Sequence, residues 1–339
     1  MDLRRLRRSL LRWFAKARRP LPWRATQDPY AIWVSEMMLQ QTTVATVIPY
    51  YQRFLQRFPT TKALAASDEA AVLSLWSGLG YYSRARNLRL AAKEVVRHHH
   101  GTFPRDPRVA IKLPGIGPYA AHAITSIAFG AHAAVVDGNV RRVLSRLHAI
   151  QGLSDRNAQS LAAVLLSPRS PGRWNEAMME LGATLCTPRN PKCAMCPVAS
   201  DCRGKDAPER WSQTKPRRAT VATRVDMALI CSEGRVLLAK NPPGRLMAGL
   251  YELPHSGIPG SATAPKSWTT QHRAIFELVG PPVATVCHTV THHRIEARVF
   301  RGRLKSAALP PTLSLHPLEE RGSLPLGGLT RKVLRVLRP

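Results

Sequence analysis

Four cysteines lie within seventeen residues, and this cluster constrains the fold more than any other feature of the chain. Cys186, Cys193, Cys196 and Cys202 are separated by six, two and five residues. Thiolates this close together can all ligate one metal centre and staple the loop that carries them. Zinc sites usually combine well-separated Cys or Cys/His pairs. One short pair, two single cysteines and no nearby histidine favour a cubane iron–sulfur cluster, with zinc as the alternative.

The charge of the chain predicts a polyanionic partner. Lys and Arg number 50 against 21 Asp and Glu, a formal net charge of +29. Such an excess binds a phosphate backbone by releasing its counterions. No long uncharged apolar run is present, so we expect no membrane span. No secretory segment is evident, which predicts reduced thiols inside the cell. We expect a cytoplasmic location in a bacterial cell, with the protein at the nucleoid through its binding of DNA.

The periodicity of the apolar residues predicts two domains, as does a length of 339 residues. Residues 1–205 show helical spacing through 31–58, 62–77, 84–97, 119–130 and 139–149, after an amphipathic helix at the start of the chain. The polar stretch 206–220 is expected to be a linker. Residues 221–339 are expected to form a smaller α+β domain, with strands near 225–230, 234–239, 285–287 and 295–300 and a helix at 267–279. Cys231 and Cys287 lie in apolar stretches there and are expected in the core.

Two carboxylates and a glycine-containing turn are candidates for chemistry. The turn Leu113-Pro114-Gly115-Ile116-Gly117 lies between two helical patterns, where exposed amides can bind phosphate. Asp137 follows twenty residues after Gly117, in front of a basic helix. Glu36 has apolar neighbours, and desolvation there would raise its pKa and suit it to general acid catalysis. A surface or capping role for Glu36 fits the pattern equally well.

These residues resemble a known family. Residues 1–205 are similar to the helix–hairpin–helix DNA glycosylases with an iron–sulfur loop. The segments Ser35-Glu36-Met37-Met38-Leu39-Gln40-Gln41-Thr42 and Gly78-Leu79-Gly80-Tyr81-Tyr82-Ser83-Arg84-Ala85-Arg86-Asn87 look like the adenine-specific, MutY-type members. Residues 221–300 resemble that family's MutT-like domain. The resemblance covers nearly the whole chain.

The resemblance implies removal of adenine mispaired with 8-oxoguanine or guanine in duplex DNA, by a monomer that carries one [4Fe–4S] cluster on the four cysteines. The base must be flipped into a pocket. Glu36 is the implied proton donor and Asp137 the implied stabiliser of the cationic sugar. Tyr119 and Asn139 match positions that line this site. Related enzymes that cut the strand carry a lysine at the position of Tyr119, so the family pattern implies a glycosylase without lyase activity.

The resemblance also implies a DNA-facing surface. Gln41 and Tyr81 match residues that wedge into the duplex beside the opposite base. Neighbouring Tyr82 could be the core residue of the pair, and the roles of the two rings could be confused. The remaining expected DNA contacts are the hairpin residues Leu113, Gly115 and Gly117, the arginines Arg24, Arg84 and Arg86, and Thr291 and His292.

The second domain departs from its family in two ways. The acidic helix of a Nudix hydrolase is missing around 274–280, which predicts binding rather than hydrolysis. The loop that would read 8-oxoguanine has Val290-Thr291-His292 where the family has Phe-Ser-His. Two other functions remain as alternatives: a glycosylase/lyase for oxidised pyrimidines, and an iron–sulfur protein that binds DNA without catalysis.

Overall fold

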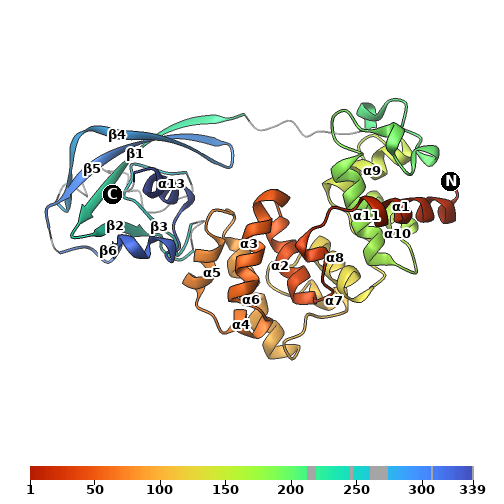
Figure 1. The fold of residues 1–339 in the computed structure, drawn as a ribbon, viewed down its shortest axis with the longest axis horizontal. Coiled ribbons are helices and arrows are strands. Elements are labelled where there is room, and N and C mark those ends of the chain that lie inside the picture. The colour runs from red at the N-terminus through yellow and green to blue at the C-terminus, as the bar shows by residue number, and fades with distance from the viewer. Residues whose placement is uncertain (212–218, 245–246, 260–273, 307, 338–339) are drawn as a thin grey trace. The chain divides into compact units, whose positions relative to one another are not determined.

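The computed structural model describes residues 1–211, 219–244, 247–259, 274–306 and 308–337. Contacts within the chain group it into two units (Figure 1). The helical unit comprises residues 1–65 and 90–216, and the sheet unit comprises residues 66–89 and 217–339. Residues 66–89 therefore pack with the C-terminal part of the chain, although the sequence pattern assigns them to the helical part. Among the described helices, none is long and apolar enough to cross a bilayer.

The helical unit begins with α1 (Leu3–Ala17), whose first amides are capped by the Asp2 carboxylate. α2 (Pro29–Leu39) starts behind the cap Asp28 and is buried on nearly all sides. The helical pattern predicted over 31–58 is broken between α2 and α3 (Val44–Arg57), because Gln41 adopts a φ of 58°. The further helices of this unit are α4 (Thr61–Ala65), the C-terminal half of α6 (Ser83–His98), α7 (Pro107–Ala110), α8 (Pro118–Phe129), α9 (Gly138–His148), α10 (Asp155–Leu165) and α11 (Pro171–Thr184).

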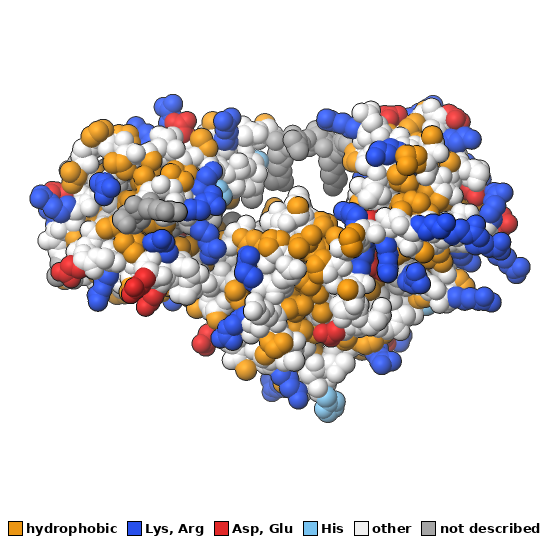
Figure 2. Space-filling view, viewed as in Figure 1, with side chains coloured by type: hydrophobic (Ala, Val, Ile, Leu, Met, Phe, Trp, Pro, Cys, Tyr) orange, Lys and Arg blue, Asp and Glu red, His pale blue; other side chains and the backbone are white. Residues whose placement is uncertain are grey.

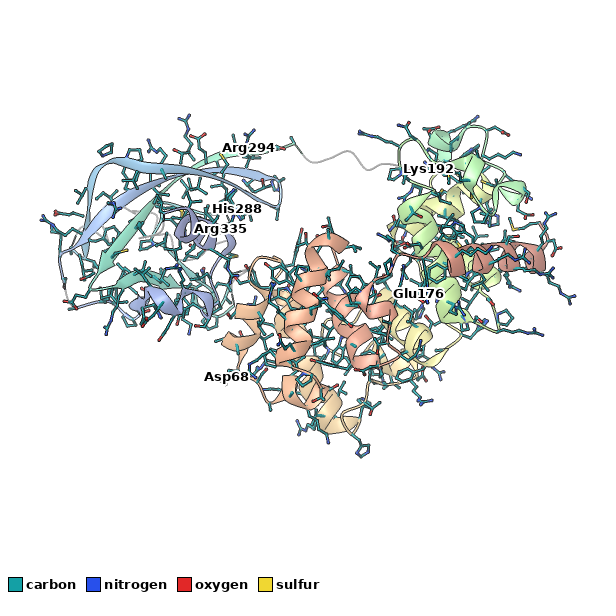
Figure 3. All side chains as sticks on the ribbon, in the orientation of Figure 1. Asp68, Glu176, Lys192, His288, Arg294 and Arg335 are labelled. Carbon is teal, nitrogen blue, oxygen red and sulfur yellow. The ribbon has the colours of Figure 1, made fainter. Side chains whose placement is uncertain are left out.

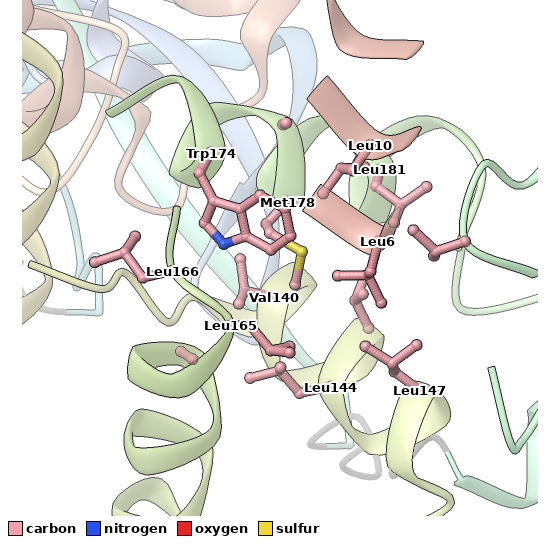
Figure 4. Close-up of a cluster of buried hydrophobic side chains, with 14 of the residues drawn as sticks. Leu6, Leu10, Val140, Leu144, Leu147, Leu165, Leu166, Trp174, Met178 and Leu181 are labelled. Atoms are coloured by element: carbon pink, nitrogen blue, oxygen red, sulfur yellow. The ribbon is translucent and has the colours of Figure 1, made fainter. Parts of the chain in front are cut away.

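One hydrophobic cluster joins α1 to α9, α10 and α11 (Figure 4). Leu6, Leu10 and Phe14 of α1 recur at the helical period and are almost completely buried. They meet residues such as Trp174 and Leu144 from the later helices. This cluster fixes α9 and α11, which carry several residues of the candidate site.

Short 3₁₀ turns follow α11. These are η2 (Cys193–Met195), η3 (Ala199–Asp201) and η4 (Pro208–Trp211). η4 falls within the expected linker 206–220, yet Arg146 of α9 donates to the Pro208 carbonyl at 2.8 Å. The start of that segment is therefore attached to the helical unit, and residues 212–218 lie outside the described part of the chain.

The described strands of the sheet unit are β1 (Val221–Ser232), β2 (Arg235–Lys240), β3 (Tyr251–Glu252), β4 (Phe276–Val290), β5 (His293–Leu304) and β6 (Leu313–Pro317). They form a mixed sheet in the order β3-β2-β1-β5-β4, with β6 also paired to β2. β1 pairs with β5 in parallel, whereas β4 and β5 form an antiparallel hairpin. The strands predicted near 225–230, 234–239, 285–287 and 295–300 are thus present, and most are longer than expected.

Helix α13 (Gly328–Val336) covers one face of the sheet, after the 3₁₀ turn η5 (Leu318–Gly322). Alternation along β5 buries Ile295, Ala297 and Val299 beneath it. The sheet unit also contains α5 (Glu69–Trp76) and the first half of α6, which come from the segment 66–89. The Ser77 hydroxyl donates to the Leu326 carbonyl, and Arg86 donates to the Ala248 carbonyl at 2.7 Å.

Two expectations for this unit were wrong. Residues 276–279 of the expected 267–279 helix are strand, because Phe276 to Val279 pair with β5; residues 267–273 lie outside the described part. Cys231 and Cys287 are exposed rather than in the core. The twofold alternation of side chains along a strand directs them outward although their neighbours are apolar.

Basic side chains are spread over the visible face of each unit, and acidic ones are fewer there (Figure 2). The charge excess of the sequence is therefore at the surface, where it can meet a polyanion.

Candidate active site and metal centre

A cavity of about 300 Å³ in the helical unit brings together the expected catalytic residues. Its walls come from η1 (Pro22–Arg24), α2, α8, α9 and α11. Glu36, Tyr119, Asp137 and Asn139 all line it. This size suits a single small molecule or base.

Glu36 is the buried acid of this cavity. It lies on α2 and is only 6% exposed. The pKa of Glu36 is raised to about 7. Burial is the largest cause, a hydrogen bond from Tyr119 lowers the pKa, and nearby Asp137 and Glu176 raise it. A carboxyl with this pKa holds its proton in a large share of molecules near neutral pH, as a general acid must.

Tyr119 lies in the first turn of α8 and faces Glu36. Its hydroxyl donates to Glu36 Oε2 at 3.0 Å. Burial, together with the charge of Glu36, raises the pKa of Tyr119 well above its usual value, so the phenol stays protonated. Tyr119 is therefore a fixed donor that sets the position of the Glu36 carboxyl.

Asp137 is the cap of α9. Oδ1 accepts from the Val140 amide at 2.6 Å, and Oδ2 accepts from Asn139 Nδ2 at 3.0 Å. A carboxylate at a helix N-terminus is favoured by the helix dipole. These two bonds leave Asp137 held in place at the wall of the cavity.

Residues of α11 and η1 complete the cavity, and most were missed from the sequence. Glu176, labelled in Figure 3, and Glu180 project from α11 one turn apart. Arg24 pairs with Glu176 at 3.3 Å and with Glu180 at 3.0 Å, and Arg19 pairs with Glu180 at 2.7 Å. Burial alone would raise the pKa of Glu180, but its bonds to Arg19 and Arg24 outweigh burial and hold it at about 2. Met179 also lines the cavity.

Two acids four residues apart, Glu176 and Glu180, lie on either side of the apolar run Ala177–Met179 and were the sequence signal for this wall. Arg24 was expected to contact DNA, but the structure pairs it with these acids inside the cavity, with its side chain only 9% exposed. Its guanidinium therefore faces the candidate base pocket.

The expected hairpin lies between α7 and α8. Gly115 adopts a φ of 74°, which favours glycine, whereas Gly117 is extended and caps α8. Leu113 and Ile116 are buried and anchor the turn. Gly117, the cap of α8, is therefore at the surface, where the helix N-terminus can meet a phosphate. Tyr119, two residues later in the chain, lines the cavity.

Gln41 and Tyr81 each lie at a turn with a left-handed backbone, with φ of 58° and 48°. Tyr81 is 45% exposed, whereas Tyr82 is 6% exposed. Tyr82 is therefore the core residue of the pair, and Tyr81 is the ring available for stacking. A non-glycine residue in this region is strained and is often found at functional turns.

Arg84 does not lie as expected. It is 6% exposed, and its guanidinium donates to the carbonyls of Leu79, Gly80 and Tyr81. Burial lowers the pKa of Arg84 to about 10. In the structure, Arg84 braces the turn that presents Tyr81. Arg86, partly buried, is bonded to the Ala248 carbonyl.

Thr291 and His292 form the two-residue turn between β4 and β5. Thr291 has a φ of 54°, which is unfavourable for a β-branched residue. Its hydroxyl lies 3.3 Å from His292 Nδ1. The turn therefore presents a hydroxyl and an imidazole together at the tip of the hairpin.

The four cysteines line a second cavity, of about 30 Å³. The Val198 amide bonds Cys196 and the Gly204 amide bonds Cys202, while burial raises the pKa of Cys196 to about 11. Arg146 Nη1 lies 3.3 Å from Cys186 Sγ. These donors would stabilise ligating thiolates. The four cysteines are the candidate ligands that line the cavity, and no acidic residue lines it. The donor set fits an all-thiolate cluster.

Arg142 links this loop to the first cavity. It donates to Asn139 Oδ1 at 2.8 Å and to the carbonyls of Gly182 and Cys186 at 2.8 Å each. Asn139 in turn bonds Asp137. A cluster bound by the four cysteines would hold the Cys186–Cys202 loop together. The loop would in turn hold Arg142 in place through the Cys186 carbonyl, and Arg142 contacts Asp137 through Asn139.

Comparisons with known proteins agree with this organisation. The HhH-GPD superfamily of base excision DNA repair proteins matches residues 34–168, the iron–sulfur binding domain of endonuclease III matches residues 186–202, and the NUDIX domain matches residues 226–336. The predictions of a helical hairpin domain, an iron–sulfur rather than a zinc site, and a MutT-like domain are confirmed. The cluster held by the four cysteines is of the [4Fe–4S] type.

Individual relatives extend over most of the chain. Adenine DNA glycosylase of Homo sapiens is 35% identical over 97% of this chain and 73% of its own length. Its counterpart in Arabidopsis thaliana is 39% identical over 75% of this chain and 48% of its own. A solved thermostable thymine-DNA glycosylase superimposes with a TM-score of 0.57, at 28% identity, over 60% of this chain and 96% of that one. The chain belongs to the family of adenine DNA glycosylases.

Proposed function

We propose that this protein is a monofunctional glycosylase that hydrolyses the N-glycosidic bond of adenine mispaired with 8-oxoguanine or guanine in duplex DNA. The observation that carries the proposal is the buried Glu36, whose pKa is raised to about 7 in a cavity it shares with Asp137. Family membership supports adenine as the excised base.

Acid catalysis follows from the chemistry of the leaving group. Adenine leaves poorly as an anion, so a ring nitrogen must take a proton as the bond to the sugar breaks. Glu36 donates that proton, and Tyr119 holds the carboxyl in place by its hydrogen bond. The carboxylate left behind can then accept a proton from the attacking water.

Charge stabilisation is the proposed role of Asp137. Loss of adenine leaves positive charge on the sugar, and a carboxylate fixed by Val140 and Asn139 is ready to oppose it. The cavity holds no lysine that could form a Schiff base, and position 119 is tyrosine. The reaction therefore ends at the abasic site with the strand intact.

Recognition of the opposite base is proposed for three turns. The exposed ring of Tyr81 and the side chain of Gln41 would fill the space left in the stack. The paired hydroxyl and imidazole of Thr291 and His292 can hydrogen-bond an oxidised purine. We infer that the protein acts as a monomer on DNA.

The test uses the full-length, cluster-loaded protein and duplexes with adenine opposite 8-oxoguanine, guanine or thymine. We expect adenine release from the first two, with strand scission only after alkali. Glu36→Gln should abolish release, and Asp137→Asn should lower it strongly, while both still bind the duplex. Asparagine can still accept the Val140 hydrogen bond through its one side-chain oxygen, so this variant removes the charge and the bond from Asn139 but keeps the helix cap.

Other outcomes would point elsewhere. Scission without alkali would identify a lyase, and tight binding without release would identify a DNA-binding protein that is not an enzyme. His292→Ala provides a separate measure of recognition, because it should lower kcat/KM for the 8-oxoguanine duplex more than for the guanine duplex.

A further inference from the structure

The sheet unit contains a cavity whose polar lining is entirely arginine. It has a volume of about 250 Å³ and lies between η5 and α13. Arg321, Arg331 and Arg335 line it, with Gly322, Leu326 and Leu334 as the remaining wall. The candidate catalytic site is formed by different residues, all in the helical unit.

The guanidinium of Arg331 has two buried nitrogens, Nε and Nη2, without a hydrogen-bond partner among the described residues. Buried donors of a charged group cost free energy when they are left without an acceptor, so native proteins nearly always provide one. The missing acceptor is the first sign of a ligand.

The charge of the cavity is the second sign. No carboxylate lines it, and the ion pairs found among the described residues do not include its three arginines. Arg331 and Arg335 are four residues apart on α13, where like charges repel. Arg321 Nη1 donates a hydrogen bond to the Leu318 carbonyl, and the other N–H groups of its guanidinium can still donate to a ligand. Three guanidinium groups around one small space suit a tetrahedral oxyanion, since each can donate two parallel hydrogen bonds.

We propose that Arg321, Arg331 and Arg335 form a phosphate-binding site on the C-terminal unit. A backbone phosphate of the DNA is the favoured source. Leu326, in the wall of the cavity, accepts the hydrogen bond of Ser77, and Ser77 directly precedes the Gly78–Tyr81 turn of the same unit. The wall of the cavity is thus bonded to the segment that leads into the turn exposing Tyr81, so a duplex bound at that turn would bring phosphates toward the cavity. Figure 3 labels Arg335 on α13. The proposal does not depend on which base the enzyme removes.

The experiment measures the affinity of the full-length, cluster-loaded protein for an undamaged duplex over a range of salt concentrations. Log affinity falls as log salt rises, and one neutralised phosphate adds about 0.9 to the magnitude of that slope. We expect Arg335→Gln and Arg331→Gln each to lower the magnitude of the slope by up to about 0.9. Arg335 is exposed, so its variant should fold even if Arg331→Gln does not. Arg301→Gln is the matched control, because it removes the same charge from an exposed position on β5 and should leave the slope nearly unchanged.

A second arm separates DNA phosphate from free phosphate. The melting temperature is measured in inorganic phosphate and in chloride at equal ionic strength. A lowered slope in the pocket variants alone supports a DNA phosphate. An unchanged slope, with phosphate stabilising the wild type but not Arg335→Gln, supports a phosphate site that serves a free anion. Equal slopes in all variants and no stabilisation by phosphate would overturn the proposal, as would an equal loss of slope in Arg301→Gln.

Discussion

Replacing Glu36 by glutamine should stabilise the protein while it abolishes adenine release. The ordinary pKa of a glutamate is 4.5, and that of Glu36 is raised to about 7, with burial as the largest cause. The folded state therefore keeps a proton that the unfolded state loses between these values. The stability contributed by the neutral carboxyl is present below pH 4.5 and is lost as the pH rises through 7.

The size of the effect follows from the shift. A difference of about 2.5 units corresponds to about 3 kcal/mol above pH 7, at 1.36 kcal/mol per unit. Glu36 is 6% exposed, so screening by solvent is small. Glutamine has nearly the same shape and no charge to bury. We expect Glu36→Gln to be more stable than the wild type by about 3 kcal/mol at pH 8 and by about 1 kcal/mol at pH 5.

The assay is thermal unfolding of the cluster-loaded protein between pH 5 and pH 8.5. A gain of about 3 kcal/mol corresponds to roughly 6 °C or more in the melting temperature of a unit this size. Glu180→Gln, in the same cavity, is the control of opposite sign. Its pKa is held at about 2, so its charged form stabilises the fold above pH 4.5 and that stability is lost as the pH falls through 2. Its glutamine variant should be less stable than the wild type at every pH tested.

A destabilised Glu36→Gln at pH 8 would refute this reasoning, and so would a stability difference that does not change with pH. Either result would mean that burial does not oppose ionisation of Glu36. Glu36 would then be ionised near neutral pH, and its proposed role as the general acid would need another source for the proton.

Three further predictions concern separate parts of the molecule. Tyr119→Phe removes the hydrogen bond that lowers the pKa of Glu36, so the alkaline fall in single-turnover adenine release should move to higher pH; an unchanged profile would exclude that bond. Tyr81→Ala should weaken binding to a mispaired duplex without lowering the melting temperature, whereas Tyr82→Ala should cost roughly 3 kcal/mol of stability by leaving a cavity; the reverse pattern would exchange their roles. Cys196→Ser should lower bound iron and the visible absorption of the cluster, and serine at the exposed cysteines of the sheet unit should change neither.

The sequence alone determined the features that depend on local spacing. Cys186 to Cys202 predicted a metal centre because ligand spacing within one loop is a local property. The Leu113–Gly117 turn was predicted because Gly115 permits a backbone conformation that few residues adopt. Strand alternation predicted β1, β2 and β5, but it could not direct Cys231 outward, since the buried face of a strand is chosen by its neighbours in the sheet.

Only the tertiary structure decided the electrostatics of the site. From the sequence alone, Glu36 could equally have been a surface acid. In the structure it shares a cavity with residues of α8, α9 and α11, and its burial raises its pKa. Arg24 and Arg84 were expected to contact DNA, yet Arg24 is paired with the acids of α11 and Arg84 braces a turn. The arginine cavity joins Arg321 to α13 by packing alone. Charge, burial and pKa depend on groups far apart in the chain, and the fold is what brings them within interaction range.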